Sequence, residues 1–390
     1  MKILLFSLES INNAGDEILR VTTEYLINDV SKDSVIALMQ LTPRWKDISG
    51  LSRIYWIVGT SLRKISKLIP FSNLSYRVRN IAYVISYKRL FKSKISKVEK
   101  VILPIGMLKY STQNFSYVFH LIISLCDSFR IPVLMSAMSP EKDNCKDWRF
   151  RQLVSAVNLP SVKMITTRDG QKGVDIIKSA YLSRDIYCDY VGDPALWIPE
   201  VYNVSHEKEY TSSPLIGINV VRKGIFSDYN KSYSDEELQN IYIELIQLIE
   251  SKGWRWKLFC NGMKRDWYVV QQLASVLNVS QEKIADLPRN GKELVKIISQ
   301  FDIIFGARLH ACLTSVSLGI PVIGFIWDDK LKYFSETMGI SHFFFQPQDM
   351  TADKIISRME EALEYNFDYE NRDKYKQKTK ESIKTFLVSM

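Results

Sequence analysis

The chain has 390 residues, a net charge of +9 and 46% hydrophobic residues, a composition typical of a folded globular protein and not of a disordered one. Its length exceeds what one hydrophobic core usually serves, so we expect two domains. The five cysteines show no Cys-x-x-Cys spacing and no run of about 20 apolar residues is present, so a disulfide framework, a zinc site and a transmembrane span are not indicated. This cysteine usage fits a reducing, cytoplasmic location.

In the first half of the chain, short apolar runs alternate with stretches of helical apolar spacing. Strands are expected at residues 2–6, 101–104, 133–137 and 164–167, and helices at 16–28, 117–129 and 171–179. This alternation predicts a doubly wound parallel sheet.

A strongly basic segment, residues 51–100, interrupts this pattern. It holds twelve Lys or Arg residues and one acidic residue, Glu99, so it carries +11 while the rest of the chain carries −2. Apolar residues between Trp56 and Ile69 are interleaved with cations, which indicates an amphipathic basic helix. Contact with anionic membrane lipids or a lipid diphosphate and a solvated face without a partner both remain open. Nucleic-acid binding is not expected, because no recognition motif is present.

A largely polar stretch, residues 200–214, is the expected domain linker and contains His206 beside Glu207. The second set of strands is expected at 215–220, 255–260, 303–305 and 322–325, with helices at 235–251, 266–277, 292–300 and 309–318. We therefore expect a Rossmann-like N-terminal domain over residues 1–205 and a second Rossmann-like domain over 206–349. Residues 350–390 are expected to form terminal helices that pack back on the first domain.

The turn between the strand at 303–305 and the helix at 309–318 holds two residues suited to chemistry, Arg308 and His310. They would lie at the carboxyl end of a parallel strand and beside a helix N-terminus, where free N–H groups favour anions. A guanidinium binds a carboxylate or phosphate in pairs of hydrogen bonds, and an imidazole moves a proton near neutral pH. A purely structural role for both residues, as a carbonyl partner and a core histidine, stays open at this point.

The run Gly306-Ala-Arg-Leu-His-Ala311, followed by Gly-Ile-Pro-Val-Ile-Gly-Phe325 and Lys330, resembles the signature of the polysaccharide pyruvyl transferase family. Further matches are Asn13-Ala-Gly15-Asp16, Arg168-Asp169, Gly192-Asp193-Pro194 and Gly217-Ile-Asn-Val-Val-Arg222. Two positions depart from the family pattern: the strand at 101–104 is not followed by a glycine pair, and Trp327-Asp-Asp-Lys330 lacks a tyrosine near the lysine.

The resemblance implies an α/β GT-B-like fold, in which two Rossmann-like doubly wound domains face a cleft. It also implies an activity: the first domain binds an acceptor sugar, and the second binds phosphoenolpyruvate, whose enolpyruvyl group is moved onto two sugar hydroxyls to form a pyruvate ketal. The acceptor is expected to be a lipid-linked or polymeric saccharide of capsule or exopolysaccharide biosynthesis, at times carried on a polyprenyl diphosphate. The enzyme would then be cytoplasmic, with residues 51–100 in peripheral contact with the inner face of the plasma membrane.

The resemblance assigns roles to individual positions. His310 would be the general acid, Arg308 would bind the carboxylate or phosphate, and Asp193 would act on the acceptor hydroxyls. Further substrate-binding candidates are Arg222, Lys330, Asn13, Gly15, Asp16, Arg168 and Leu309. For the aspartates a helix-cap role is the alternative, for Arg168-Asp169 an interdomain ion pair, and for Arg222 and Lys330 plain solvation.

No cofactor and no metal are expected beyond phosphoenolpyruvate as co-substrate. Asp328-Asp329 lacks a third ligand at suitable spacing, and no Gly-x-Gly-x-x-Gly or Walker motif is present. Two other hypotheses remain: a GT-B glycosyltransferase in which Arg308 and His310 bind a nucleotide-sugar diphosphate, and a non-catalytic binding protein that has kept the fold.

Overall fold

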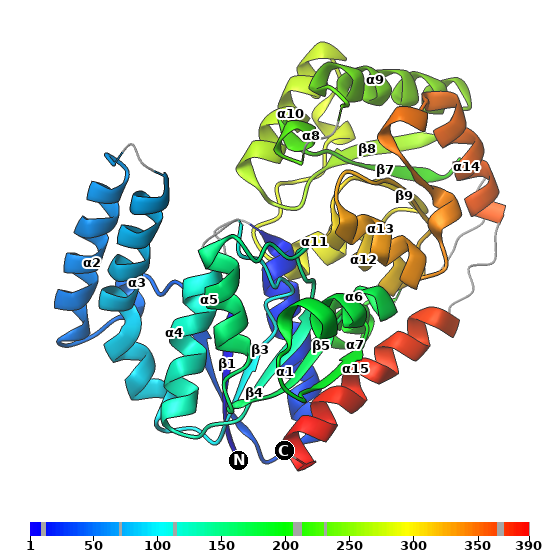
Figure 1. Ribbon diagram of the computed structural model, residues 1–390. Helices are drawn as coiled ribbons and strands as arrows, with labels where there is room; N and C mark the ends of the chain where they lie inside the picture. The colour runs from blue at the N-terminus through cyan, green and yellow to red at the C-terminus, as the bar shows by residue number, and fades with distance from the viewer. Residues whose placement is uncertain are drawn as a thin grey trace. The chain divides into compact units, whose positions relative to one another are not determined.

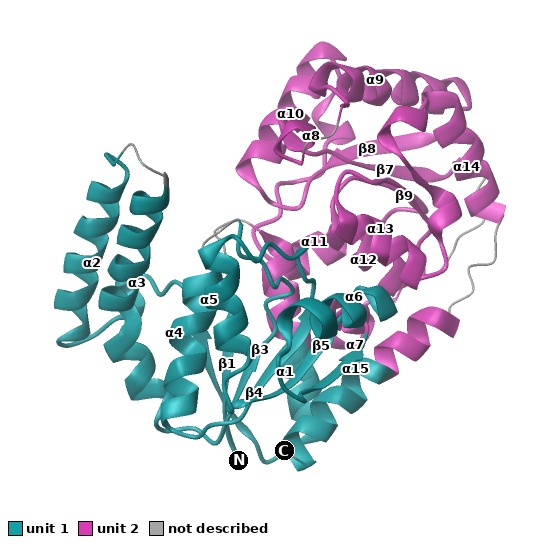
Figure 2. Cartoon of the chain, in the orientation of Figure 1, with its two compact units in different colours: residues 1–9, 23–191, 378–390 teal, residues 10–22, 192–377 magenta. Residues whose placement is uncertain are grey.

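The computed structural model describes residues 1–8, 13–69, 72–111, 115–205, 213–229, 232–364 and 370–389. The chain forms two compact units (Figure 2). Unit 1 contains residues 1–9, 23–191 and 378–390, and unit 2 contains residues 10–22 and 192–377. These ranges differ from the expected domains in two ways. The main division falls between Val191 and Gly192, and residues 10–22 belong to the second unit.

Unit 1 is built on a six-stranded parallel sheet with the order β2-β1-β3-β4-β5-β6 (Figure 1). Its strands are β1 (Lys2–Ser7), β2 (Val35–Gln40), β3 (Lys100–Leu103), β4 (Val133–Met138), β5 (Val162–Thr167) and β6 (Tyr187–Tyr190). The four strands predicted from sequence are the central ones and are confirmed. β2 and β6 were not predicted, and both are edge strands with partly exposed side chains. β6 lacks the continuous apolar run that marks a buried parallel strand, whereas β2 has such a run, Val35 to Met39, and was missed.

The helices of unit 1 follow its strands. They are α1 (Ala14–Val30), α2 (Ser52–Ser66), α3 (Ser72–Ile95), α4 (Phe115–Ser128), α5 (Trp148–Val157) and α6 (Gly170–Ile176), the last continued by a π-turn over Ile177–Tyr181. Side chains from α3, α4 and α5 pack in one core with Leu4, Phe6, Val101 and Leu103, which share one face of the sheet. The basic segment is therefore a helical hairpin, α2 and α3, that ends where β3 begins.

Unit 2 is built on a five-stranded parallel sheet with the order β11-β10-β9-β7-β8. Its strands are β7 (Leu215–Asn219), β8 (Arg255–Phe259), β9 (Ile303–Gly306), β10 (Val322–Phe325) and β11 (Phe344–Phe345). Its helices include α7 (Ile198–Tyr202), α8 (Ile225–Asp228), α9 (Asp235–Ser251), α10 (Lys264–Val276), α11 (Gly291–Ile298), α12 (Leu309–Leu318), α13 (Asp329–Thr337) and α14 (Ala352–Glu364). The four predicted strands are confirmed, and α9 and α12 have the predicted bounds.

The terminal helices divide between the units. α14 places Ile355, Ile356 and Met359 in the core of unit 2, and α15 (Glu370–Ser389) belongs to unit 2 up to residue 377 and to unit 1 after it. In unit 1 the ammonium of Lys100 donates hydrogen bonds to the carbonyls of Phe386 and Leu387, at 2.6 and 3.0 Å. Within the expected linker, α7 is helical, and His206 and Glu207 lie outside the described residues.

Candidate active site

The candidate site lies at the carboxyl edge of the unit 2 sheet, where β7, β9 and β10 are neighbours. Arg222 follows β7, Arg308 follows β9, and Trp327 and Lys330 follow β10. Because the strands are parallel and adjacent, the segments that leave them emerge at the same edge. This edge is the usual ligand-binding edge of an open α/β sheet.

A buried carboxylate from α10 holds Arg308. The guanidinium of Arg308 donates from Nε to Oδ2 of Asp266 at 3.0 Å and from Nη2 to Oδ1 at 2.6 Å, and Asp266 is fully buried. The backbone N–H of Arg222 also donates to Oδ1 of Asp266, at 2.9 Å. Asp266 therefore fixes the position of both arginine-bearing segments and compensates the charge of Arg308.

The turn before α12 is fixed by three further polar side chains. Oδ1 of Asn219 accepts hydrogen bonds from the N–H groups of Ala307 and Arg308, at 3.2 and 3.0 Å, and the amide of Asn219 bonds that of Asn261 at 3.1 Å. On the other side, the indole N–H of Trp327 donates to the carbonyl of Ala307 at 2.6 Å. The guanidinium carbon of Arg308 lies 5.7 Å from the centre of the Trp327 ring, so backbone and side chain are both held.

Helix α12 begins directly after Arg308, whose backbone is extended (φ −117°, ψ 136°). Arg308 itself provides no side-chain cap for this helix, since its guanidinium bonds Asp266 instead. The helix dipole therefore favours negative charge at the turn that carries Leu309 and His310. Both residues are half-buried.

The first motif of the chain lies against this turn. Gly15 is buried at the start of α1, and a Cβ atom built on it would lie 2.2 Å from Nδ1 of His310 and 2.4 Å from its Cγ. Asn13 accepts a hydrogen bond from the N–H of Gly15 at 3.3 Å, and the N–H of Ala14 donates to the carbonyl of Asn261 at 3.2 Å. Unit 2 therefore brings together two motifs, at 13–16 and 308–310, that sequence reasoning placed in different domains; Asp16 lies in the first turn of α1.

Asp193 lies at the start of a short 3₁₀ turn, Pro194–Trp197, that packs against α12. Its carboxylate is buried, and Oδ1 accepts a hydrogen bond from the N–H of Ala195 at 2.9 Å, which is the geometry of a helix cap. The hydroxyl of Ser317 in α12 reaches the carbonyl of Leu196 at 3.5 Å. Asp193 thus lies in unit 2 with the Arg308 turn and has a structural role there.

The acidic pair before Lys330 is also a cap. Oδ1 of Asp328 accepts hydrogen bonds from the N–H groups of Lys330 and Leu331, at 2.5 and 3.4 Å, which starts α13 and places Lys330, half-buried, in its first turn. Within the described ranges, no group of three or more His, Cys, Asp or Glu side chains is placed to hold a metal ion.

Tyr229, which sequence reasoning did not select, lies beside these residues. Its ring packs edge-on against Trp327, with centroids 4.9 Å apart and an interplanar angle of 77°. Burial raises the pKa of Tyr229, and the charge of Asp328 raises it further, while those of Arg308 and Arg222 oppose the shift. The phenol therefore remains a hydrogen-bond donor at neutral pH, suited to an anionic ligand. The guanidinium of Arg222 pairs with Asp228, at the end of α8.

Arg168 belongs to unit 1, whereas the residues of the Arg308 turn belong to unit 2. It follows β5 and is buried, and its Nη2 donates to the carbonyl of Gly106 at 2.9 Å while its Nε reaches Oγ of Ser139 at 3.4 Å. The hydroxyl of Ser139 donates to Oδ1 of Asp169 at 2.7 Å. Arg168 thus ties together three loops at the carboxyl edge of the unit 1 sheet.

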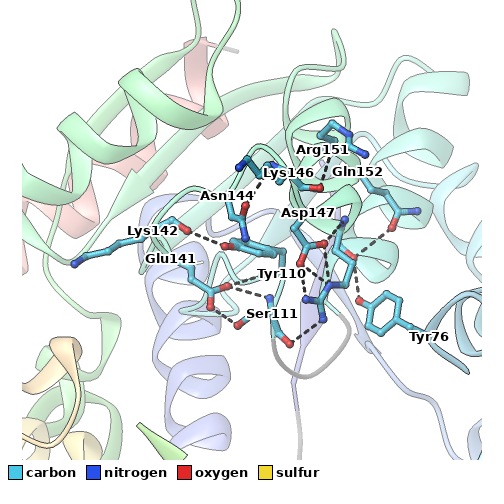
Figure 3. A network of polar contacts seen from close by, with 12 residues as sticks. Tyr76, Tyr110, Ser111, Glu141, Lys142, Asn144, Lys146, Asp147, Arg151 and Gln152 are labelled. Atoms are coloured by element: carbon cyan, nitrogen blue, oxygen red, sulfur yellow. Dashed lines mark hydrogen bonds and ion pairs between the residues drawn. The ribbon is translucent and has the colours of Figure 1, made fainter. Parts of the chain in front are cut away.

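A further network orders two of these loops (Figure 3). Oε2 of Glu141, after β4, accepts hydrogen bonds from the N–H groups of Tyr110 and Ser111, after β3, at 2.9 and 3.0 Å. Asp147 caps α5 by accepting from the N–H of Arg149 at 2.8 Å, and the Arg149 side chain also bonds this carboxylate. Hydrogen bonds from the Arg149 guanidinium lower the pKa of Asp147. The edge of the unit 1 sheet is therefore preformed.

The two Rossmann-like parallel sheets give this chain an α/β fold of the GT-B type. Solved structures that resemble the chain share this fold. UDP-GlcNAc 2-epimerase from Neisseria meningitidis, bound to UDP-GlcNAc, matches with a TM-score of 0.59 and 13% identity over 100% of both chains. The UDP-GlcNAc 2-epimerase of Methanocaldococcus jannaschii matches with a TM-score of 0.57 and 11% sequence identity over 100% of both chains. That of Rickettsia bellii matches with a TM-score of 0.55 and 12% identity over 100% of this chain and 96% of its own.

The chain belongs to the polysaccharide pyruvyl transferase family, whose sequence model matches residues 13–329. This confirms the resemblance carried by the 306–330 and 13–16 motifs, and it makes the chain a transferase of polysaccharide biosynthesis. No curated protein matches the chain significantly.

Proposed function

We propose that this enzyme transfers the enolpyruvyl group of phosphoenolpyruvate onto two hydroxyls of a saccharide, forming a pyruvate ketal and releasing phosphate. The observation that carries the proposal is the turn at the start of α12, which presents Arg308 and His310 together at the carboxyl edge of the sheet, with Arg222 anchored to the same carboxylate, Asp266. A substrate with a carboxylate and a phosphate suits such a turn, because both groups bind guanidinium and helix N-termini.

Asp266 limits what Arg308 can do in this reaction. The carboxylate accepts one hydrogen bond each from Nε and Nη2 of Arg308 and compensates its charge, so a ligand would be bound by the remaining N–H groups of the guanidinium. We expect Arg308 to position the substrate and Lys330 to contribute a second cationic group. The Tyr229 phenol adds a neutral donor beside them.

In the proposed reaction, His310 protonates the methylene carbon of phosphoenolpyruvate, and the adjacent carbon gains positive character. A sugar hydroxyl attacks that carbon and gives its proton to a base, for which Asp193 and Asp16 are the candidates. The bond to the phosphate oxygen then breaks, with the arginines stabilising the departing phosphate. Attack by a second hydroxyl, which also loses its proton, closes the ketal.

The acceptor is proposed to be a lipid-linked or polymeric saccharide, with a polyprenyl diphosphate as its carrier in the lipid-linked case. The expected first-domain role in acceptor binding would fall to unit 1, where Glu141 and Arg168 order the loops at the sheet edge.

The test is incubation with phosphoenolpyruvate and a panel of lipid-linked saccharides, scored for phosphate release and for the mass gain of a pyruvyl ketal. In D₂O the new methyl group should carry deuterium, because its third hydrogen comes from solvent. His310→Ala should abolish ketal formation, whereas His342→Ala, at an exposed histidine of the same unit, should retain it. Thermal protection by UDP but not by phosphoenolpyruvate would instead indicate a nucleotide-sugar glycosyltransferase and overturn the proposal.

A further inference from the structure

Helix α2 of unit 1 turns its apolar face to solvent. Ile54, Val58 and Ile65 follow one another at spacings of four and seven residues, which places them on one helix face, and they are 57%, 46% and 53% exposed. Leu51 and Tyr55 flank the same stripe and are also exposed. None of these side chains belongs to the core of unit 1, so this stripe stabilises nothing within the unit.

The opposite face of α2 consists of small residues. Ser52, Gly59 and Ser66 recur every seven residues and are the buried residues of this helix. A Cβ atom on Gly59 would lie 2.4 Å from the carbonyl oxygen of Ala82 in α3, so the two helices approach closely. The hydroxyl of Ser75 in α3 donates to the carbonyl of Ser66 at 2.7 Å. α2 therefore packs against α3 through small side chains. Its Trp56 is partly buried and packs against the core of unit 1, whereas Ile54, Val58 and Ile65 stay exposed.

α3 lies between α2 and the rest of unit 1. It packs against α2 on one side and against α4 on the other, and it gives Tyr83, Tyr87 and Phe91 to the core (Figure 1). The outward face of α2 is thus the outermost surface of the hairpin within its unit. An amphipathic helix of a globular protein normally turns its apolar stripe toward the core, so the reversed orientation needs an external partner.

The charge around this stripe selects the partner. No acidic residue occurs between Leu51 and Val98, while Arg53, Arg63 and Lys64 lie on α2 and six further cations lie on α3. A second copy of the chain would bring the same cations face to face, which opposes self-association through this surface. A nucleic acid would match the cations and leave the apolar stripe uncovered. An anionic lipid surface matches both features, because headgroups attract the cations and the acyl boundary takes the apolar side chains.

We propose that α2 lies on the surface of an anionic membrane, with Ile54, Val58 and Ile65 at the boundary between headgroups and acyl chains. The helix lies in the plane of the surface and does not cross it: no helix in the described part of the chain has the length and apolarity to span a bilayer. Within residues 51–100, the membrane contact is thus made by the exposed face of α2. It does not depend on the proposed reaction, since membrane binding is measured without substrate.

The test is co-sedimentation of the full chain with vesicles of phosphatidylcholine alone or with about 30 mol % phosphatidylglycerol. Wild type should sediment with the anionic vesicles and at least about tenfold less with the neutral ones. Ile54→Ser/Val58→Ser/Ile65→Ser should lower binding to anionic vesicles by at least about tenfold. The matched control is Tyr268→Ser/Val276→Ser, which removes exposed apolar side chains from α10 in unit 2 and should bind as wild type.

A second variant tests the electrostatic part of the proposal. Arg63→Glu/Lys64→Glu should remove the preference for anionic over neutral vesicles, and raised salt should do the same for wild type. Equal sedimentation of the triple serine variant and wild type would overturn the proposal. So would a light-scattering measurement in which the triple variant turns a wild-type dimer into a monomer, because the stripe would then be a protein interface.

Discussion

His310 lies directly against Gly15, at the point where α1 contacts the turn after β9. The space beside the Cα atom of Gly15 holds a hydrogen atom but not a Cβ atom. Any Cβ at position 15 would come closer to the imidazole than real contacts allow, so Gly15→Ala must move the ring or the start of α1. We expect kcat for pyruvyl transfer to fall by about 10²-fold, the usual cost of displacing a reacting group by about 1 Å.

The control for this variant is Gly253→Ala. Gly253, unlike Gly15, has a positive φ, 71°, and it has no heavy atom within 4 Å of its would-be Cβ, so that substitution strains the backbone without displacing a neighbour. It should reduce thermal stability slightly and leave kcat unchanged. Wild-type kcat in Gly15→Ala would show that the ring position does not matter.

The Arg308–Asp266 pair predicts a large stability effect for a residue at the site. Arg308→Met would leave the fully buried Asp266 without its counter-charge, which should cost about 3–5 kcal/mol of unfolding free energy in urea. Arg308→Met/Asp266→Leu should recover most of that stability but no activity, which separates the two roles of the arginine.

The comparison for this pair is Arg289→Met. It breaks an ion pair of similar geometry with Glu293 in which the arginine side chain is 85% exposed, so stability should barely change. Equal losses in Arg308→Met and Arg289→Met would contradict the importance of burial.

Trp327→Phe tests how the turn is held. The substitution removes the indole donor to the buried Ala307 carbonyl, and we expect a loss of about 1–3 kcal/mol together with lower activity, because the carbonyl precedes Arg308. Trp256→Phe is the matched substitution, since its indole donates to Glu250, which is partly exposed and can be hydrated instead. Urea unfolding of both variants should therefore rank Trp327→Phe as the less stable.

Asp147 predicts a pH effect in unit 1. The Arg149 guanidinium lowers the pKa of this carboxyl in the folded state, so its stabilising contribution is present above the unfolded pKa and is lost as the pH falls through the folded one. Asp147→Asn should lower the urea midpoint near pH 7, and the difference from wild type should shrink steadily as the pH falls below about 4. The exposed Asp175→Asn should show no such pH-dependent difference. A constant difference for Asp147→Asn across the pH range would contradict the charge argument.

The central strands of both sheets were predictable, because buried parallel strands are continuous apolar runs, as Val322 to Phe325 illustrates. The position of Arg222 and Arg308 at the same edge of the sheet was also predictable, because each follows one of two neighbouring parallel strands. Asp266 and Tyr229 were not predictable, because single polar residues carry no periodic pattern. Asn219 lies within the quoted 217–222 motif, but nothing in the motif indicated that its side chain holds the Arg308 turn. Their partners are also far away in sequence: Asn219 bonds a backbone group 89 residues later.

The division into units was predictable only in part for the same reason. Gly15 contacts His310, which lies almost 300 residues later in the sequence, and this contact places Gly15 in unit 2. No local pattern near residue 22 indicates that α1 passes from one unit to the other. Likewise, the outward stripe of α2 has the spacing of an ordinary amphipathic helix, and only the packing of Gly59 shows which face is buried.

The bonds from Lys100 to the carbonyls of Phe386 and Leu387 have a consequence for synthesis of the chain on the ribosome. Unit 1 begins with the first strand of the chain. Its core is complete only when Ile383 and Phe386, near the end of the sequence, have been synthesised and buried. Unit 2 needs nothing beyond residue 377. Domains usually fold in the order of synthesis, from the N-terminus onward. In this chain the last core residues of unit 1 follow all of unit 2 in the sequence, so unit 1 cannot complete its core before unit 2 has been synthesised.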